Sequence, residues 1–203
     1  MDPKLPKKFI LSIKPEEYLK QGVSHCGVYS LKAILSAFGK DNKTIPQDYH
    51  LDWLRRKSLS FTFGKHYYDK IFESNGVRAE TTTAKNVSDS EKLNFLKEHI
   101  AKNIPIMIRI GNGYTFSNRY SPFWGRIILH WITLWGYDDK KQEFYAYDSA
   151  LPRKYWEVNK LPTGNTKRKF HEILRDWKFG KWNPLAWSTW REDYVYIKVQ
   201  NKN

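Results

Sequence analysis

Cys26 is the only cysteine among 203 residues, and it lies where a loop containing glycine and serine passes into a helical pattern. Apolar residues recur at helical spacing over residues 28–38, so the sequence predicts a helix that starts near the cysteine. A thiol in the first turn of a helix faces the positive end of the helix dipole, which favours the nucleophilic thiolate. Gly27 adds no side chain beside the sulfur and leaves room for a substrate backbone. This combination predicts a nucleophilic cysteine.

Gln21 precedes the cysteine in the same loop and offers a side-chain amide that can fold back towards the sulfur. Its NH2 group and the backbone N–H of Cys26 would together form an oxyanion hole, which stabilises the tetrahedral intermediate of acyl transfer. The alternative for Cys26 is structural, because a free cysteine is often a small buried core residue. A second cluster of polar residues, far along the chain, favours the catalytic interpretation.

His130 and Asp148 form that second cluster, on two predicted strands joined by a turn at residues 139–141. In the register that this turn implies, the two residues fall close together at the end of the hairpin away from the turn. There the histidine can carry a proton between thiol and leaving group while the carboxylate orients the imidazole. Each residue also has a structural explanation, since an aspartate that closes a strand is often a turn former.

The elements that must position these residues are helices in the first half of the chain and strands in the second. Besides the helix of Cys26, the predicted helices cover residues 47–57, 66–75, 88–103 and 166–179. The predicted strands cover residues 9–13, 77–83, 104–110, 127–137, 143–148, 155–158 and 194–199. We therefore expect one α+β domain over residues 1–203, with the helix of the cysteine packed on a C-terminal antiparallel sheet.

The formal net charge of +14 favours anionic partners, such as nucleic acid, an acidic membrane surface or acidic peptides. The lysines are spread along the chain, and no zinc-finger, helix-turn-helix or RNA-binding sheet motif is present. A generally basic surface is therefore favoured, and nucleic acid is not the expected partner.

A single cysteine excludes an intramolecular disulfide and a multi-thiolate metal site. The remaining histidines lack metal-ligand spacing, so we expect neither a metal nor a cofactor. The N-terminal residues show no signal-peptide pattern, and no stretch approaches the roughly 18 apolar residues of a membrane span. We expect a soluble protein, cytoplasmic in preference to secreted.

Two blocks of the sequence resemble papain-like cysteine peptidases of the bacteriocin-leader-processing (double-glycine) type and the peptidase-like family around them. Residues 21–39 contain a Gln, a short gap, Cys-Gly and an apolar helix that ends in Gly. Residues 130–138 begin with a His and continue as an apolar strand that ends in Gly-Tyr-Asp, and the next strand ends at Asp148. These blocks cover about a fifth of the chain.

The resemblance implies a papain-like fold and a role for each residue in the two blocks. Cys26 would be the nucleophile, His130 the base, Asp148 the orienting carboxylate and Gln21 the oxyanion donor. The sequence departs from the family pattern at Ser149, which stands where proline is common after the aspartate.

Three functions are consistent with these residues. The first is a thiol hydrolase that cleaves a peptide or amide bond of a peptide or protein through an acyl-enzyme. The second is an acyltransferase of the transglutaminase-like type, and the third is a catalytically degenerate, basic binding module. The loop before His130 is predicted to line a substrate cleft with Tyr114, Phe116, Tyr120, Phe123 and Trp124. The tryptophan-rich segment over residues 177–190 is predicted to pack over the core.

Overall fold

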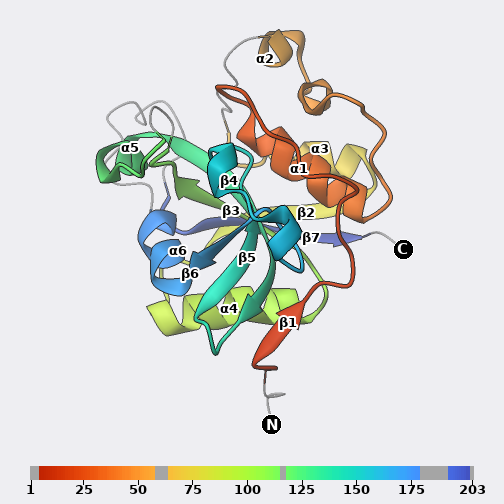
Figure 1. Cartoon of the computed structure of the whole chain (residues 1–203). Coiled ribbons are helices and arrows are strands. Elements are labelled where there is room, and N and C mark those ends of the chain that lie inside the picture. The colour runs from red at the N-terminus through yellow and green to blue at the C-terminus, as the bar shows by residue number, and fades with distance from the viewer. Residues whose placement is uncertain (1–4, 58–63, 115–117, 179–191, 202–203) are drawn as a thin grey trace.

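Seven antiparallel strands form one sheet in the part of the chain that the structure describes (Figure 1). The structure is a computed structural model, and it describes residues 5–57, 64–114, 118–178 and 192–201. The strands are β1 (Lys8–Ile10), β2 (Val77–Thr83), β3 (Ile106–Gly111), β4 (Leu129–Asp138), β5 (Glu143–Tyr147), β6 (Thr166–Lys169) and β7 (Val195–Asn201). Six of them follow the order β2-β7-β3-β4-β5-β6, and β1 pairs with β4 outside that path.

Helices contact this sheet from two sides. The α-helices are α1 (Cys26–Ala37), α2 (Trp53–Lys57), α3 (Tyr67–Ser74), α4 (Asp89–Ala101), α5 (Pro122–Ile127) and α6 (Phe170–Trp177), and the 3-10 helices are η1 (Pro46–Tyr49), η2 (Arg153–Tyr155) and η3 (Val158–Lys160). α1 packs on β4 and α3 on β2, while α4 and α6 pack on β3 and contact each other. Figure 1 shows α1 and α3 above the sheet and α4 below it. The central strands therefore lie between helices.

Burial follows from this arrangement. All residues of β3 and nearly all of β4 are buried, as the almost continuous apolar runs of these strands require. The edge strands β2 and β6 instead alternate between buried and exposed residues. In α1, every residue from Gly27 to Leu35 is buried, so the helix is part of the core. The first residue of α1 is thereby held against the sheet.

The β4–β5 hairpin has the turn that the sequence predicts, with Asp138 opposite Glu143 and Thr133 opposite Tyr147. A bulge between Leu134 and Gly136 shifts the register by one residue. The open end of the hairpin therefore lies where Thr133 faces Tyr147, the last residue of β5, and residues 129–132 of β4 extend beyond this pair.

The predicted α+β order of helices followed by an antiparallel sheet is confirmed. Four local predictions were wrong. Residues 47–57 do not form one helix, because residues 50–52 separate η1 from α2. Residues 155–158 form no strand and instead run from the end of η2 to the start of η3, and residues 122–127 form α5 inside a predicted loop. The predicted helix over 166–179 starts only at Phe170, because residues 166–169 form the edge strand β6 paired with β5.

Within residues 5–57, 64–114, 118–178 and 192–201, no helix combines the length and the apolar character needed to cross a bilayer. The prediction that residues 1–203 form one domain stays a prediction. Phe116 and the tryptophan-rich residues 179–191 lie outside the described residues.

Candidate active site

Cys26 is the first residue of α1, and its side chain is partly exposed. His25 turns the chain into the helix with φ 78°, a left-handed conformation that is uncommon outside glycine. Its carbonyl oxygen accepts the N–H groups of Val28 and Tyr29 at 3.1 and 3.3 Å. A Cβ on Gly27 would overlap the phenol of Tyr68, so glycine is needed for the close approach of α1 to α3.

A hydrogen bond from α1 to β4 sets the distance between the cysteine and the sheet. Ser30, one turn after Cys26, donates its hydroxyl to the carbonyl oxygen of Trp131 at 3.1 Å. Both residues are buried, and Trp131 directly follows His130 in β4. This bond fixes the cysteine end of α1 beside the imidazole.

His130 is almost fully buried near the start of β4, opposite Ile110 of β3. Its Nε2 lies 2.7 Å from Oδ1 of Asp148, so Nδ1 is the ring nitrogen left for the thiol. Burial lowers the pKa of His130, but the charge and hydrogen bond of Asp148, with a smaller contribution from Cys26, raise it to about 10. The geometry thus favours an imidazolium beside the sulfur.

Asp148 directly follows β5 and is held by several donors. Its Oδ1 also accepts the N–H groups of Ala150 and Leu151, both at 3.0 Å. Asn165 brackets its main chain, because the amide oxygen accepts Asp148 N–H and the amide nitrogen donates to Asp148 O, both at 2.8 Å. Burial raises the pKa of Asp148, but the charge and hydrogen bond of His130 outweigh this and hold the pKa below its usual range.

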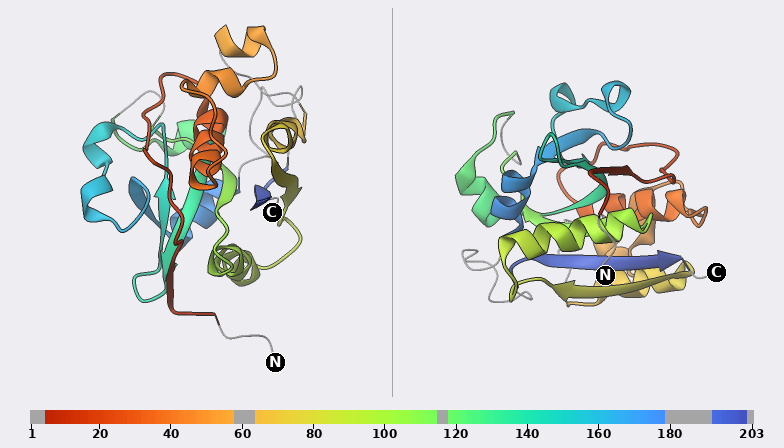
Figure 2. Two further views of the ribbon diagram at one scale, coloured as in Figure 1. Left: turned by 90° about the vertical axis from the view of Figure 1, so that its right-hand side faces the viewer. Right: turned by 90° about the horizontal axis from the view of Figure 1, so that it is seen from below.

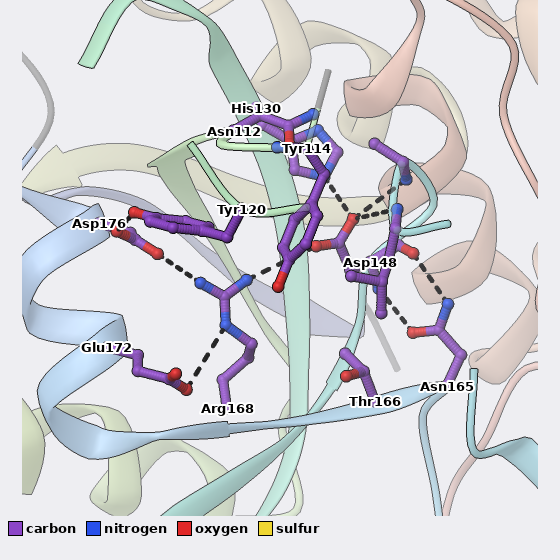
Figure 3. A network of polar contacts seen from close by, with 12 residues as sticks. Asn112, Tyr114, Tyr120, His130, Asp148, Asn165, Thr166, Arg168, Glu172 and Asp176 are labelled. Atoms are coloured by element: carbon purple, nitrogen blue, oxygen red, sulfur yellow. Dashed lines mark hydrogen bonds and ion pairs between the residues drawn. The ribbon is translucent and has the colours of Figure 1, made fainter. Parts of the chain in front are cut away.

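A buried arginine lies behind this carboxylate (Figure 3). Arg168 of β6 approaches Oδ2 of Asp148 at 3.7 Å and pairs with Asp176 of α6, while Glu172 lies 4.0 Å from its Nε. Tyr120 donates its hydroxyl to Oδ1 of Asp176 at 2.6 Å. The guanidinium is therefore shared by two buried carboxylates, one of which is the partner of His130, and Arg175 also pairs with Asp176 at 2.7 Å.

Gln21 is buried and is joined twice to Ser149, the residue after Asp148. The backbone N–H of Gln21 donates to Ser149 O at 3.0 Å, and the hydroxyl of Ser149 donates to Oε1 of Gln21. Because the amide oxygen is occupied, the NH2 group is the end of this side chain that remains to donate to a substrate. Lys20 strengthens the junction through Nζ, which bonds the carbonyl oxygens of Ser149 and Ala150 at 3.3 and 2.9 Å.

His25, the other histidine beside the cysteine, belongs to a different chain of hydrogen bonds. Its Nδ1 lies 3.1 Å from Nε2 of His50, and Nδ1 of His50 lies 2.9 Å from the hydroxyl of Tyr67. Tyr67 also accepts Leu51 N–H at 3.3 Å. Burial lowers the pKa of His50 to about 4, so His50 is neutral at ordinary pH, and burial also lowers the pKa of His25. His25 is therefore directed to His50.

A cavity of about 340 Å³ borders the carboxylate side of the site. Leu151 and Arg168, both contacts of Asp148, line it together with Tyr114, Tyr120 and Tyr155. Tyr114 and Tyr120 belong to the loop that the sequence predicted to line a cleft. Phe123 and Trp124 belong to α5 and do not line this cavity, and Phe123 is exposed.

The structure brings together the residues that the sequence singled out. The thiol of Cys26 lies close enough to the imidazole of His130 to raise the pKa of that ring. Gln21 lies against the segment that carries Asp148. In the described part of the chain, no three His, Cys, Asp or Glu side chains gather as metal ligands would.

Sequence reasoning missed three polar residues that support the site, namely Asn165, Arg168 and Asp176. Each bonds Asp148 or its neighbours from another element. Residues 166–169 are all polar or charged, so their alternation between buried and exposed positions is visible only in the structure.

Comparison with known proteins gives both a family and a fold. The family model described as "Peptidase_C39 like family" matches residues 10–180. No curated protein sequence matches the chain.

Three solved structures resemble this one at low sequence identity. Xylellain, a cysteine protease from Xylella fastidiosa, is 13% identical with a TM-score of 0.56, over 98% of this chain and 88% of that chain. A putative C39-like peptidase from Bacillus anthracis is 14% identical with a TM-score of 0.51, over 97% of this chain and 99% of that chain. A double glycine motif protease from an AMS/PCAT transporter, in complex with the leader peptide, is 14% identical with a TM-score of 0.50, over 95% of this chain and 94% of that chain. The fold is therefore that of papain-like cysteine proteases.

Proposed function

Because this chain belongs to the Peptidase_C39 like family and is thus a cysteine peptidase-like hydrolase, we propose that it cleaves peptide bonds with Cys26, His130 and Asp148. The observation that carries the proposal is the 2.7 Å contact between Nε2 of His130 and Oδ1 of Asp148. This contact leaves Nδ1 of the imidazole for the thiol and keeps the ring charged through the buried carboxylate.

In the first half of the reaction, the thiol proton resides on His130 and the sulfur of Cys26 attacks the carbonyl carbon of the scissile bond. The resulting oxyanion accepts hydrogen bonds from Cys26 N–H and from the NH2 group of Gln21. His130 then donates its proton to the leaving amine, the C–N bond breaks, and the acyl group remains on sulfur as a thioester.

In the second half, a water molecule enters where the amine left. His130 takes a proton from this water while its oxygen attacks the thioester carbon. The C–S bond breaks, and the thiolate and imidazolium are restored as the carboxylate product departs. Asp148 keeps one orientation of the imidazole through both steps, which is the role its fixed hydrogen bonds suit.

A peptide is the substrate that the available features support. A structurally similar protease has a leader peptide bound, and the cavity beside Asp148 offers tyrosine rings, an aliphatic wall and charged groups to side chains of a peptide. The acyl-enzyme would also serve an acyltransferase, which differs only in using an amine in place of water.

The test is incubation of the wild-type protein with a mixed peptide library, followed by mass spectrometry of the peptides and of the intact protein. We expect cleaved peptides and a short-lived adduct on Cys26, both lost in Cys26→Ser and His130→Ala. His171→Ala, which removes an exposed histidine of α6, is the matched control and should keep activity.

Adding an amine such as glycine methyl ester separates the two fates of the acyl group. Products that end in a free carboxylate support hydrolysis. Products that are mostly amides of the added amine would make the protein an acyltransferase. Complete absence of cleavage and of any adduct would favour the degenerate binding module.

A further inference from the structure

Exposed apolar side chains gather at α2, on the segment that follows η1. Leu51, Trp53 and Leu54 are exposed by 50%, 70% and 65% of their surfaces. Arg56 and Lys57, which follow directly, are also exposed. We call these five residues the α2 patch. A tryptophan and two leucines within four positions of an exposed segment form an apolar surface that commonly marks an interaction site.

Polar contacts hold α2 in place, so these apolar residues are presented to the outside by a fixed scaffold. Asp52 caps the helix through Oδ1, which accepts Arg55 N–H at 2.9 Å. Arg56 Nε donates to the carbonyl oxygen of His50 at 3.0 Å, and the guanidinium of Arg55 lies 4.9 Å from the ring centre of Tyr67. None of the residues of α2, all of which the structure describes, is buried.

We propose that the α2 patch binds the surface of an anionic lipid bilayer. Trp53, Leu51 and Leu54 would enter the boundary between headgroups and acyl chains, where tryptophan is favoured. Arg56 and Lys57 would contact the lipid phosphates. The net charge of +14 draws the whole molecule towards such a surface.

Other anionic or apolar partners fit the patch less well. A nucleic acid would use the tryptophan for stacking, but two exposed leucines add nothing to contacts with bases and phosphates. A second copy of this chain would bring two molecules of charge +14 together, which disfavours association. A bilayer with acidic lipids accepts both the apolar and the cationic residues.

The patch lies at the end of the molecule where the cysteine lies. Figures 1 and 2 show α2 projecting from the side on which α1 begins. His50 connects the two, since its carbonyl oxygen accepts Arg56 and its ring contacts His25, the neighbour of Cys26. Val23 in the same loop is 81% exposed. Bilayer binding through α2 would therefore bring the Cys26 loop close to the lipid surface.

The test is sedimentation of the full chain with vesicles of phosphatidylcholine, alone or mixed with about one third phosphatidylglycerol. We expect binding to the mixed vesicles only, and weaker binding as salt is raised. Trp53→Ser with Leu54→Ser should lower the affinity at least about tenfold. Val87→Ser, at an exposed apolar residue outside the patch, should leave it unchanged. Cys26→Ser should bind like the wild type, because binding does not depend on catalysis.

A charge-matched pair of variants decides whether binding is local. Arg56→Gln with Lys57→Gln should weaken binding more than Lys140→Gln with Lys141→Gln, which removes the same charge from the exposed turn of the β4–β5 hairpin. Circular dichroism confirms that each variant is folded. Equal losses from the two pairs, or full binding by the Trp53 and Leu54 variant, would overturn the proposal. So would oligomers that form without vesicles and dissociate in that variant, or oligonucleotide binding that needs Trp53 while vesicle binding does not.

Discussion

Ser149 holds the side-chain amide of Gln21 by its oxygen, and the main chains of the same two residues are joined at 3.0 Å. Ser149 is also the position where the sequence departs from the common proline. Proline has no hydroxyl group, whereas the hydroxyl of Ser149 donates the hydrogen bond that orients the side chain of Gln21. In the proposed mechanism, the residue after Asp148 thus sets which end of the Gln21 amide faces a substrate.

Ser149→Ala should lower kcat/KM about tenfold, mainly through kcat, because the Gln21 amide loses the bond that orients it. Gln21→Ala should lower kcat/KM about a hundredfold, as expected for the loss of one oxyanion donor. The double variant should be no worse than Gln21→Ala, since Ser149 acts through Gln21. Steady-state kinetics on one peptide measures all three, and effects that multiply would show that Ser149 acts by another route.

Asp148→Asn should move the alkaline limb of the kcat/KM profile to lower pH. In the wild type the pKa of His130 is raised to about 10, so the imidazolium persists until the pH approaches that value. The substitution removes the charge that raises this pKa and leaves the burial that lowers it. We expect kcat/KM to fall at least about tenfold near neutrality. A profile with an unchanged alkaline limb would contradict the assigned partnership of His130 and Asp148.

Gly27→Ala should destabilise the fold by about 1–3 kcal/mol, the usual cost of overpacking. The new methyl group would overlap the phenol of Tyr68, which is buried and stacks edge-on against Trp131 at 5.5 Å between ring centres. Gly22→Ala is the matched control, because its Cβ would meet no atom of the described residues within 4 Å. Urea unfolding compares the two, and equal midpoints would contradict the close contact of α1 with α3.

Arg168→Met should destabilise the protein by about 1–3 kcal/mol, because Asp148 and Asp176 lose their shared cation, although His130 and Arg175 still pair with them. Arg168→Lys keeps the positive charge but loses the forked geometry of the guanidinium. Its stability should therefore lie between those of the wild type and of Arg168→Met. Adding Asp176→Asn to Arg168→Met should recover part of the loss. Denaturant unfolding measures these differences, and wild-type stability of Arg168→Met would argue against a charge role for the arginine.

Much of the fold could be predicted because its signals are local. The apolar helical pattern after Cys26 gives α1, and Gly39, with φ 67°, follows its end as expected. The two strands around the turn at residues 139–141 give β4 and β5. The pairing of these strands in turn places His130 near Asp148.

The rest depends on contacts between distant residues. β6 has four polar or charged residues, and it becomes a strand because it pairs with β5 and because Arg168 meets Asp148 and Asp176 inside. The bond between Ser149 and Gln21 spans 128 positions. No local pattern reports such contacts, so the support of the site could not be derived from the sequence.

The pH dependence of Cys26 alkylation tests the central claim most directly. Iodoacetamide labelling would be followed between about pH 5 and pH 9 for the wild type, for His130→Gln and for glutathione. The imidazolium of His130 beside the sulfur predicts that wild-type Cys26 reacts faster than glutathione at acidic pH, and that His130→Gln loses this advantage. A wild-type rate that rises with pH as glutathione does, unchanged by His130→Gln, would contradict the account.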